Sequence, residues 1–361
     1  MTSVLIFANE FPPDLGGAGV VAYQNAIELH RRGYKVTVLT RKSESRIQNY
    51  PFNVVEINKR SFLWSFQLLI YLLSTTYDFY FLNDQVSIYL FGLIASKEKK
   101  KRAFCFVHGS EINNIFKSPS VLRRFIFFKK IYIEALKSSR KVIFPSENML
   151  KRFFLACNHS NISSIVSYAG ISSDFFVDPK INFRHKLSIP DEATILLSVS
   201  RVHLDKGYLE KYQIFKNIYK TKKDLFWVVV GDGPFLNEFK KLVEIDGFSG
   251  SIIFLGRVPR EELLDIYHSA DLFWLLSKFE ESFGLVYIEA NACGLPCIGS
   301  NLGAVEEAII NGVSGFIVNS SKECEDLILK GTYLKILSDD CFQNAQRFII
   351  QSQFQRIEDL L

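Results

Sequence analysis

Residues 280–289 read Glu280-Glu281-Ser282-Phe283-Gly284-Leu285-Val286-Tyr287-Ile288-Glu289. The pattern predicts a helix from about Gly284 through Ala292 that ends at Gly294-Leu295-Pro296. Glu281 then lies in the loop that enters the helix, and Glu289 lies about a turn and a half inside it. The first backbone N–H groups of such a helix have no partner within it, so they can bind an anion such as a diphosphate.

The two carboxylates on either side of this helix start can bind hydroxyl groups. A carboxylate accepts hydrogen bonds from two neighbouring hydroxyls at once, which suits the diol of a ribose or of a sugar. A diphosphate between two such polyols is the chemical description of a nucleotide sugar. Taken alone, Glu281 and Glu289 are equally consistent with a solvated helix end, so the interpretation depends on the rest of the chain.

Short apolar segments alternate with helical patterns along most of the chain. The predicted strands of the first half are Val4–Ala8, Lys35–Thr40, Asn53–Ile57, Asp78–Leu82, Ala103–Val107, Val142–Phe144 and Ser164–Tyr168. Those of the second half are Thr194–Val199, Phe226–Val230, Ile252–Leu255, Asp271–Leu275, Pro296–Gly299 and Gly315–Val318. This alternation is typical of an α/β protein with doubly wound parallel sheets. The turn-rich stretch from Gly170 to Ala193 divides the strands into two series, which predicts two Rossmann-like domains.

Other short motifs occur along the second half of the chain in a fixed order. They are Val199-Ser200-Arg201 with Lys206-Gly207, Val228-Val229-Val230-Gly231-Asp232-Gly233-Pro234, Phe254-Leu255-Gly256, the stretch from Tyr267 to Asp271, and Gly315-Phe316. Together with the Glu281–Glu289 pattern, this ordered set resembles the retaining glycosyltransferases of family 4 and their Glu-x7-Glu motif. The match is dense from Ile195 to Val318 and sparser before it.

The resemblance implies the GT-B fold, in which two Rossmann-like domains face a central cleft. The expected domains are residues 1–173 on the acceptor side and residues 174–344 for the nucleotide sugar. The segment Gln343–Leu361 reads as helical, and residues 345–361 are expected to pack back on the N-terminal domain. Ligands of doubly wound sheets bind at the carboxyl ends of the strands, and the Arg201, Gly231 and Glu281 motifs follow predicted strands.

The resemblance also assigns roles in the second domain. Arg201 and Lys206 take the place of the family's diphosphate clamp, where two cations neutralise the negative charge that builds on the leaving group. Glu289 then binds the ribose, and Glu281 orients the donor sugar. The remaining donor-binding residues are Gly231, Phe283, Gly284 and Leu285. Without the other motifs, the Arg201–Lys206 segment would read as an ordinary basic loop.

Two segments of the first domain complete the expected site. His108-Gly109 resembles the family's His-Gly segment, so His108 is expected to face the donor sugar. Gly16-Gly17 resembles the loop that approaches the diphosphate and the acceptor.

A competing interpretation treats Gly17-x-Gly19-x-x-Ala22 as a dinucleotide fingerprint, with Arg41 serving NADP. That fingerprint should begin directly after a strand, yet eight residues separate Ala8 from Gly17. No acidic residue ends the second strand either. The dehydrogenase interpretation is therefore not favoured.

The linker departs from the family pattern. The family usually has Asn-Gly-Val/Ile-Asp, whereas this chain has Ala169-Gly170-Ile171-Ser172. The departure puts the contacts at the linker in doubt, although not the fold. We find no Asp-x-Asp motif that would hold a divalent ion on the diphosphate. We therefore expect no metal or other cofactor, because Arg201 and Lys206 would take the place of the metal ion.

The cysteines indicate a reducing compartment. The six cysteines are scattered, with no CxxC pair, and Cys293 and Cys297 bracket Gly-Leu-Pro, which favours buried thiols. No signal peptide is expected, and the longest apolar stretch, Phe62–Leu73, is too short to span a membrane and reads as a buried helix. We expect a cytoplasmic protein.

The charge is unevenly distributed. Residues 1–173 carry a net charge of +12 and residues 174–361 carry −7, which predicts an anionic partner for the first half. Two basic stretches contribute, Lys97–Arg102 and the aromatic segment Arg123–Tyr132, which reads as helical. The mixture suits an anionic membrane surface, and a half-buried helix with solvated cations is the alternative. Nucleic acid is not favoured, because no recognition motif accompanies the charge.

These observations predict a hexosyl-type glycosyltransferase that moves a sugar from a nucleotide diphosphate sugar to an acceptor hydroxyl with retention. Polysaccharide or glycolipid assembly at the inner membrane face, with a lipid-linked saccharide as acceptor, fits the basic half. Two alternatives stay open. One is a nucleotide-sugar 2-epimerase, which releases an epimerised sugar without an acceptor. The other is a non-catalytic nucleotide-sugar-binding protein.

Overall fold

The computed structural model describes residues 1–13, 16–43, 49–57, 70–159 and 161–361. The chain forms two compact units, one from residues 1–170 and 350–361, the other from residues 171–349. The expected boundaries, after residue 173 and before residue 345, lie within five residues of these divisions. No helix in the described ranges is both long enough and apolar enough to cross a membrane.

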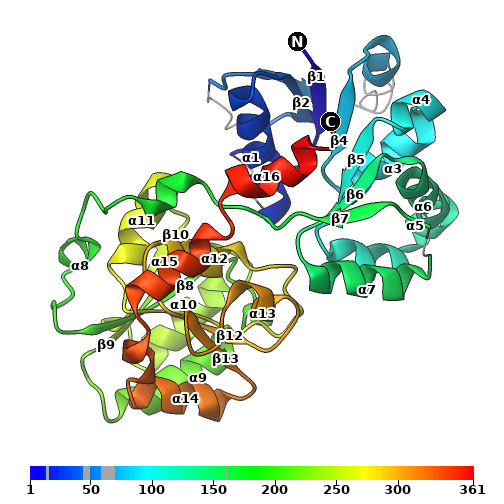
Figure 1. The fold of residues 1–361 in the computed structure, drawn as a ribbon. Coiled ribbons are helices and arrows are strands. Elements are labelled where there is room, and N and C mark those ends of the chain that lie inside the picture. Colours follow the sequence, from blue (N-terminus) through cyan, green and yellow to red (C-terminus); the bar gives the residue numbers. More distant parts are fainter. Residues whose placement is uncertain (14–15, 44–48, 58–69, 160) are drawn as a thin grey trace. The chain divides into compact units, whose positions relative to one another are not determined.

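The first unit contains a seven-stranded parallel sheet with the order β3-β2-β1-β4-β5-β6-β7 (Figure 1). Its strands are β1 (Ser3–Phe7), β2 (Lys35–Arg41), β3 (Asn53–Ile57), β4 (Phe79–Leu82), β5 (Ala103–Phe106), β6 (Lys141–Phe144) and β7 (Ser164–Val166). All seven coincide with predicted strands to within two residues at either end. The strand order reverses at β1, which is the doubly wound arrangement that the alternating pattern predicts.

Helices cover both faces of this sheet, so its strands are apolar on both sides. They are α1 (Gly17–Arg31), α3 (Gln85–Ile94), α4 (Lys97–Lys100), α5 (Val121–Phe125), α6 (Phe128–Ser138), α7 (Glu147–Cys157), α16 (Ile350–Glu358) and the π-helical turn η1 (Ile112–Lys117). Along β1, Val4 and Ile6 belong to the core under α1 and α16, whereas Leu5 and Phe7 belong to the core under α3 and α6. This accounts for the continuous apolar strands of a parallel sheet.

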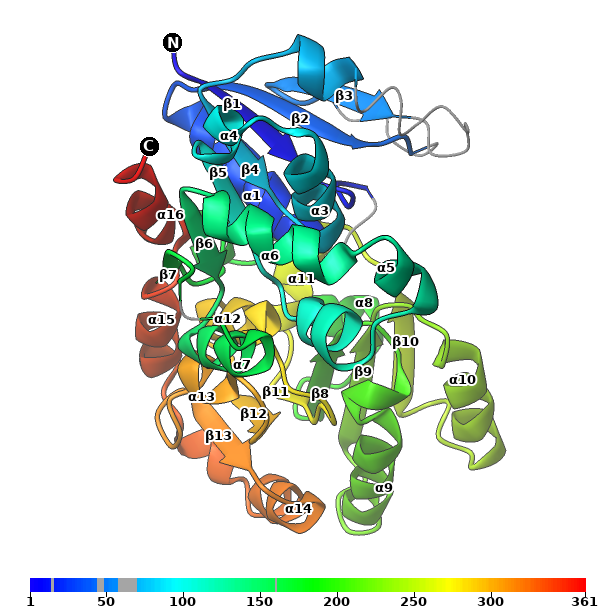
Figure 2. The same ribbon diagram turned by 90° about the vertical axis from the view of Figure 1, so that its right-hand side faces the viewer.

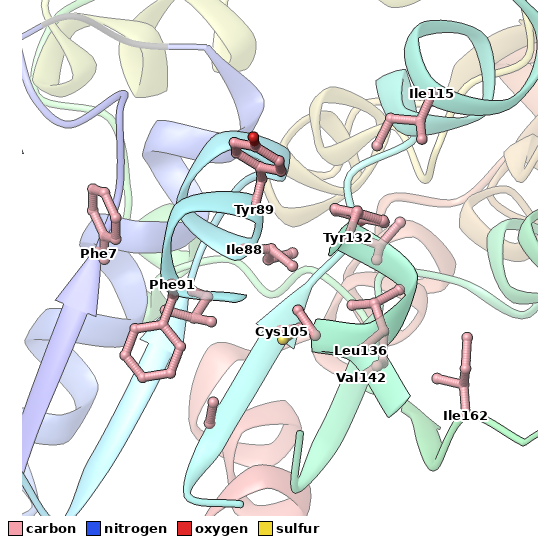
Figure 3. Packing of buried hydrophobic residues seen from close by; sticks show 14 of the residues in the cluster. Phe7, Ile88, Tyr89, Phe91, Cys105, Ile115, Tyr132, Leu136, Val142 and Ile162 are labelled. Carbon is pink, nitrogen blue, oxygen red and sulfur yellow. The ribbon is translucent and has the colours of Figure 1, made fainter. Parts of the chain in front are cut away.

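The core under α3 and α6 is the larger of the two clusters in the first unit. The two helices contact each other and lie side by side (Figure 2). Ile88 of α3, Cys105 of β5 and Leu136 of α6 are each fully buried and meet in one cluster (Figure 3).

The C-terminal helix α16 belongs to the first unit and contacts α1 (Figure 1). Phe354 and Ile357 are buried in the cluster that also contains Val4 and Ile6. Arg32, at the end of α1, forms an ion pair with Glu358 and donates a hydrogen bond to the Gln351 carbonyl oxygen at 2.9 Å. The returning segment is thus part of the first hydrophobic core.

The second unit contains a six-stranded parallel sheet with the order β10-β9-β8-β11-β12-β13 (Figure 1). Its strands are β8 (Thr194–Val199), β9 (Leu225–Val230), β10 (Ile252–Gly256), β11 (Leu272–Leu275), β12 (Cys297–Ser300) and β13 (Gly315–Val318). Each lies within one residue of a predicted strand. Here the order reverses between β8 and β11, so the loops that follow these two strands meet at a topological switch point.

The helical segments of the second unit include short 3₁₀ turns. They are η2 (Ser173–Phe176), α8 (Phe183–Lys186), η3 (Leu204–Lys206), α9 (Tyr208–Tyr219), α10 (Leu236–Ile245), α11 (Arg260–His268), α12 (Leu285–Ala292), α13 (Val305–Ala308), α14 (Ser321–Leu329), η4 (Thr332–Lys335) and α15 (Ser338–Gln346). Under α9 the core includes Trp227 and Trp274, both fully buried. A lysine, Lys211, is also fully buried there, with its amine 4.2 Å from the centre of the Tyr208 ring.

The segment Arg123–Tyr132, expected to be helical, is helical with a break in the middle. The structure has two helices, α5 and α6, and Phe127 between them adopts the left-handed conformation with φ of 51°. Phe128, the first residue of α6, stacks on Tyr89 with 4.3 Å between ring centres. That tertiary contact fixes where α6 begins, and the sequence carries no Gly or Pro to mark the break.

The segment Gln343–Leu361, also expected to be helical, contains a second break. Helix α15 ends at Gln346 and α16 starts at Ile350, so the intervening residues leave the helix. Ile349 forms a parallel bridge with Ile171, and Phe348 packs on Phe283 with 5.0 Å between ring centres. The chain therefore exchanges helical hydrogen bonds for tertiary contacts at this point. The expected helix Phe62–Leu73 falls mostly on residues 58–69, outside the described part of the chain.

Candidate functional site

Two predicted residues form an ion pair at the switch point of the second unit. Lys206 ends η3, in the segment after β8, and Glu281 lies in the segment between β11 and α12. The Lys206 amine donates to Glu281 Oε1 at 2.7 Å, and Ser277 Oγ donates to the same oxygen. Both charged side chains are largely buried, with exposed fractions of 15% and 10%. The Lys206 amine also lies 4.4 Å from the centre of the Phe279 ring.

Backbone contacts hold these two loops together. Gly207 has φ of +67°, and a β-carbon there would lie 2.0 Å from the carbonyl oxygen of Leu276. The Lys278 N–H donates to the Asp205 carbonyl oxygen at 2.7 Å. Only a glycine allows this approach in this conformation, so Gly207 places Lys206 beside Glu281.

A third loop supports Glu281 from the end of β12. The Ala304 N–H donates to the Glu281 carbonyl oxygen at 3.0 Å. A β-carbon at Gly303 would lie 2.3 Å from that same oxygen. Sequence reasoning missed Ser277, because a lone Ser carries no signal until the loops are in place.

Glu289 lies in α12 and is 8% exposed. Its Oε2 accepts a hydrogen bond from the Tyr267 hydroxyl at 3.1 Å, and its Oε1 lies 3.9 Å from Arg260 Nη2. Burial, followed by the negative charge of Glu289, raises the pKa of Tyr267 well above its ordinary value, so its hydroxyl keeps its proton. Sequence reasoning noticed the Tyr267–Asp271 stretch and gave it no role, and it missed Arg260.

The start of α12 differs slightly from the expected one. Gly284 caps the helix with φ of +90°, and α12 begins at Leu285. Phe283 is 2% exposed and packs on Phe348, so its side chain belongs to the core. Gly284 and Leu285 thus place the helix N-terminus, and their expected contacts with a donor stay predictions.

Arg201 and Gly231 lie on adjoining loops after β8 and β9. The Val202 N–H donates to the Asp232 carbonyl oxygen at 3.0 Å. Gly231 has φ of +128°, and a β-carbon there would lie 2.0 Å from the Ser200 carbonyl oxygen. Gly231 therefore holds the two loops together, and the Arg201 side chain is exposed.

In the first unit, the loops after β1, β4 and β5 are linked by hydrogen bonds. A ring nitrogen of His108, Nε2, lies 2.8 Å from the Asn83 carbonyl oxygen, and the Asn83 amide donates to the Ala18 carbonyl oxygen at 2.8 Å. Glu111, which is 1% exposed, accepts from the Gly109 N–H at 2.6 Å. Glu111 is a loop-fixing residue that sequence reasoning did not identify.

The Gly16-Gly17 pair starts α1. Gly16 caps the helix, and a β-carbon there would lie 2.4 Å from the Glu10 carboxylate, whereas a β-carbon at Gly17 would meet nothing within 4 Å. The Asn83–Ala18 hydrogen bond joins the first turn of α1 to the His108 loop within the same unit.

Two family models of known proteins match this chain. A family model described as "Glycosyl transferases group 1" matches residues 179–350. A second, described as "Glycosyltransferase Family 4", matches residues 15–164. Between them the two models leave out only the ends of the chain and the linker.

The protein is a family 4 glycosyltransferase.

Individual relatives carry the same kind of name. The chain is 30% identical over 195 residues to lipopolysaccharide 1,2-N-acetylglucosaminetransferase of Salmonella typhimurium, a match that covers 52% of this chain and 51% of that protein. It therefore spans about half the length of that relative. It is 26% identical to N-acetyl-alpha-D-glucosaminyl L-malate synthase of Bacillus anthracis, over 84% of this chain and 81% of the relative.

Solved structures show the same fold along the whole chain. The Anabaena protein Alr3699/HepE in complex with UDP and glucose superposes with a TM-score of 0.81 at 18% identity, over 99% of each chain. At that identity the likeness establishes the fold, which is GT-B.

The dinucleotide-fingerprint alternative does not fit the glycosyltransferase structure. Gly17 and Gly19 lie inside the first turn of α1, and β1 ends at Phe7. The glycines thus belong to the helix, not to a tight turn directly after the strand. Arg41, the residue suggested for NADP, donates to Asn9 Oδ1 at 3.2 Å.

All six cysteines of the glycosyltransferase are buried free thiols, as their scattered pattern indicates. Among the residues that the structure describes, no group of three His, Cys, Asp or Glu side chains could hold a metal ion. The expectation of a reaction without a metal cofactor stays a prediction.

The unusual linker of the glycosyltransferase has a defined structure. The Ile171 N–H donates to the Phe348 carbonyl oxygen at 2.9 Å, and Ser172 Oγ accepts from the Asp174 N–H to start η2. A β-carbon at Gly170 would lie 2.6 Å from Ile350 Cα. The Gly of the family pattern is thus needed for close chain packing, whatever residues stand beside it.

Proposed function

We propose that this glycosyltransferase moves a hexosyl group from a nucleotide diphosphate sugar to an acceptor hydroxyl with retention of configuration. The observation that supports it most is the Lys206–Glu281 pair at the switch point, where loops after β8 and β11 meet. The second carboxylate, Glu289, lies on the helix that follows β11. A cation for the diphosphate and two carboxylates for hydroxyl groups are the groups that a nucleotide sugar requires.

In the proposed reaction, the bond between the anomeric carbon and the diphosphate oxygen breaks while the acceptor oxygen bonds to the same face of the sugar. The acceptor proton passes to the leaving diphosphate. Lys206 and the exposed Arg201 stabilise the charge that develops on the diphosphate, without a metal ion. Glu281, whose Oε1 already accepts from Lys206 and Ser277, orients the sugar hydroxyls in this scheme and does not attack the anomeric carbon.

Nucleotide binding tests the proposal. We expect one of UDP, GDP or ADP to raise the unfolding temperature of the wild-type protein by several degrees, with a chelator present, because ligand at a hundred times its Kd adds about 2.7 kcal/mol. Glu289→Ala should lose this shift. The matched control is Asp265→Ala, another buried carboxylate of the second unit, which accepts from the Lys180 N–H at 2.7 Å and should keep the shift.

No shift with any nucleoside diphosphate, or a shift with NADP alone, would contradict the proposal. Sugar analysis then separates the remaining alternatives. A 2-epimerase converts the donor without an acceptor, and a non-catalytic binding protein leaves it unchanged. A transferase consumes it only when an acceptor is present, and the anomeric configuration of the product tests retention.

We further propose that the acceptor is a lipid-linked saccharide reached from an anionic membrane surface on the inner face of the cell membrane. The names of the relatives mention lipopolysaccharide and L-malate, so they do not choose between a lipid-linked and a soluble acceptor. The surface of the first unit favours the lipid. A cavity of about 490 Å³ there has a basic and aromatic lining that includes Arg124, Phe127, Lys129 and Lys130.

Exposed apolar side chains lie beside this cavity. Phe125 is 81% exposed and Phe127 is 69% exposed, although burial of each ring would stabilise the fold. Phe127 also occupies the left-handed region, which is uncommon for a bulky residue. Large exposed apolar groups beside cations are the features of an interfacial membrane-binding surface.

Vesicle binding tests this surface. We expect the wild-type protein to sediment with phosphatidylglycerol vesicles at low salt, to be released from them by high salt, and not to sediment with neutral phosphatidylcholine vesicles. Replacing Phe125 and Phe127 by serine should weaken binding at least tenfold, since each ring contributes more than 1 kcal/mol when buried. Ile245→Ser is the matched control, because Ile245 is also 81% exposed and lies in the second unit. Equal loss in both variants, or no binding by the wild type, would argue against the membrane and leave the transferase proposal intact.

A further inference from the structure

Glu289 is held on one side by a buried tyrosine. Tyr267 is fully buried, and its ring contacts Phe273 and Phe175 with centres 6.1 and 6.3 Å away. Its hydroxyl is 3.1 Å from Glu289 Oε2. The hydroxyl donates to this oxygen, so rotation of the Glu289 carboxylate would break the bond.

The other oxygen of Glu289 faces a guanidinium. Arg260, the first residue of α11, lies over the Phe175 ring with 5.0 Å between the guanidinium carbon and the ring centre. Its Nη2 is buried and has no hydrogen-bond partner among the described residues. The distance from Nη2 to Glu289 Oε1 is 3.9 Å, too long for a direct hydrogen bond.

The 3.9 Å separation of these two atoms suits a single bridging hydroxyl group. An oxygen about 2.8 Å from each of them would accept a hydrogen bond from Arg260 and donate one to Glu289. Buried donors are nearly always satisfied, so an unpartnered Nη2 beside a carboxylate oxygen indicates a group that arrives with a ligand or with water. A ribose hydroxyl has the required donor and acceptor capacity.

We propose that Arg260 binds the ribose of the donor together with Glu289, and that Tyr267 is a positioning residue that fixes Glu289 for this contact. The inference rests on the proposed function, because it concerns the ribose-binding part of the same site. It adds a second ribose-binding side chain, from α11, to the carboxylate on α12. Recognition of the ribose then depends on two side chains whose separation is set by Tyr267 and Phe175.

The test compares ribonucleotides with deoxyribonucleotides. We expect the wild-type protein to bind UDP, or GDP or ADP if the donor carries that base, ten to a hundred times more tightly than the 2′-deoxy form, as measured by calorimetry. Arg260→Met keeps the length of the side chain over Phe175 and should reduce the ratio of the two Kd values to near one. Tyr267→Phe keeps the ring and should reduce the ratio several-fold.

Tyr212→Phe is the matched control. Tyr212 is also buried in the second unit, and its hydroxyl donates to the Asp246 carboxylate at 2.8 Å. This variant should keep the wild-type ratio. The unfolding temperature of each variant shows whether it is folded, and the ratio of Kd values does not depend on the folded fraction.

Each outcome separates the inference from the proposed function. If the wild type binds the ribo and deoxy forms equally, or if Arg260→Met and Tyr267→Phe weaken both forms by the same factor, the ribose-binding role is overturned and nucleotide binding stands. If the wild type binds no nucleoside diphosphate, the proposed function itself fails. A reduced ratio in both variants with an unchanged ratio in Tyr212→Phe supports the inference.

Discussion

Replacing Lys206 by alanine is expected to lower kcat about a hundredfold, with a smaller change in the Kd of the nucleotide. Lys206 is the cation of the buried pair with Glu281, at 2.7 Å. In the proposed reaction the diphosphate gains negative charge as its bond to the sugar breaks, so the amine acts more strongly on the transition state than on the bound donor. Loss of one such charge-stabilising contact costs about 2.7 kcal/mol or more.

The matched control is Lys216→Ala. Lys216 forms a comparable ion pair in the second unit, with its amine 3.0 Å from the Asp246 carboxylate. Because that pair is more exposed and lies away from the switch point, we expect kcat to stay within twofold of the wild-type value. Steady-state kinetics and the unfolding temperature should be measured on both variants. Wild-type kcat in a folded Lys206→Ala enzyme would remove Lys206 from the reaction.

Replacing Lys211 by methionine is expected to raise the free energy of unfolding at pH 7. Lys211 is fully buried, and its amine donates to Ser198 Oγ at 2.8 Å without a carboxylate partner in the described structure. Burial, reinforced by the positive charge of Lys206, lowers the pKa of Lys211 well below its ordinary value. Methionine keeps the volume of the chain, and Ser198 Oγ keeps its bonds to Trp227 and Trp274.

The sign of the pH dependence follows from the two states of this amine. Below its ordinary pKa the unfolded chain binds a proton that the folded chain lacks, so folding must release it. Stability therefore rises with pH from the lowered folded pKa up to about 10.5, by at most about 1.4 kcal/mol per pH unit from this group. At pH 7 the wild type carries this penalty and the methionine variant does not.

Denaturant unfolding at pH 7, 8 and 9 checks this prediction. We expect Lys211→Met to be more stable than the wild type at pH 7 and the difference to shrink at each higher pH. Lys241→Met, an exposed lysine on α10, should follow the wild type at every pH. A methionine variant that is less stable than the wild type at pH 7 would mean that the contacts of the amine with Ser198 and Tyr208 outweigh its burial.

The strands and the switch-point loops were predictable because their signals are local. An apolar segment such as Thr194–Val199 is buried on both faces of a parallel sheet, and the structure forms β8 from the same residues. Gly207 directly follows Lys206, and Gly284 lies between Glu281 and Glu289. Both glycines adopt positive φ. The order of these segments along the chain carried the family resemblance.

The features that the sequence did not predict depend on contacts between residues far apart in the chain. The break at Phe127 is fixed by the stacking of Phe128 on Tyr89, 39 residues earlier in the chain. The break before α16 depends on Ile349 meeting Ile171. The pairing of Tyr267 with Glu289 joins two helices, and a buried tyrosine in a sequence looks the same whether or not it meets a carboxylate. No local pattern encodes such partners.

The return of α16 to the first unit affects the order in which the chain can fold during synthesis. Phe354 and Ile357 fill the core against residues of β1, α1 and β5, yet they are made after the whole of the second unit. While residues 171–349 emerge from the ribosome, the face of the first sheet that α16 later covers lacks this helix, and its apolar side chains stay exposed. The second unit, continuous in sequence, can finish folding first. A truncated message, or a protease that cuts the chain before residue 350, would thus produce a protein without α16. Its first unit would be incomplete and prone to aggregate, while its second unit would be intact.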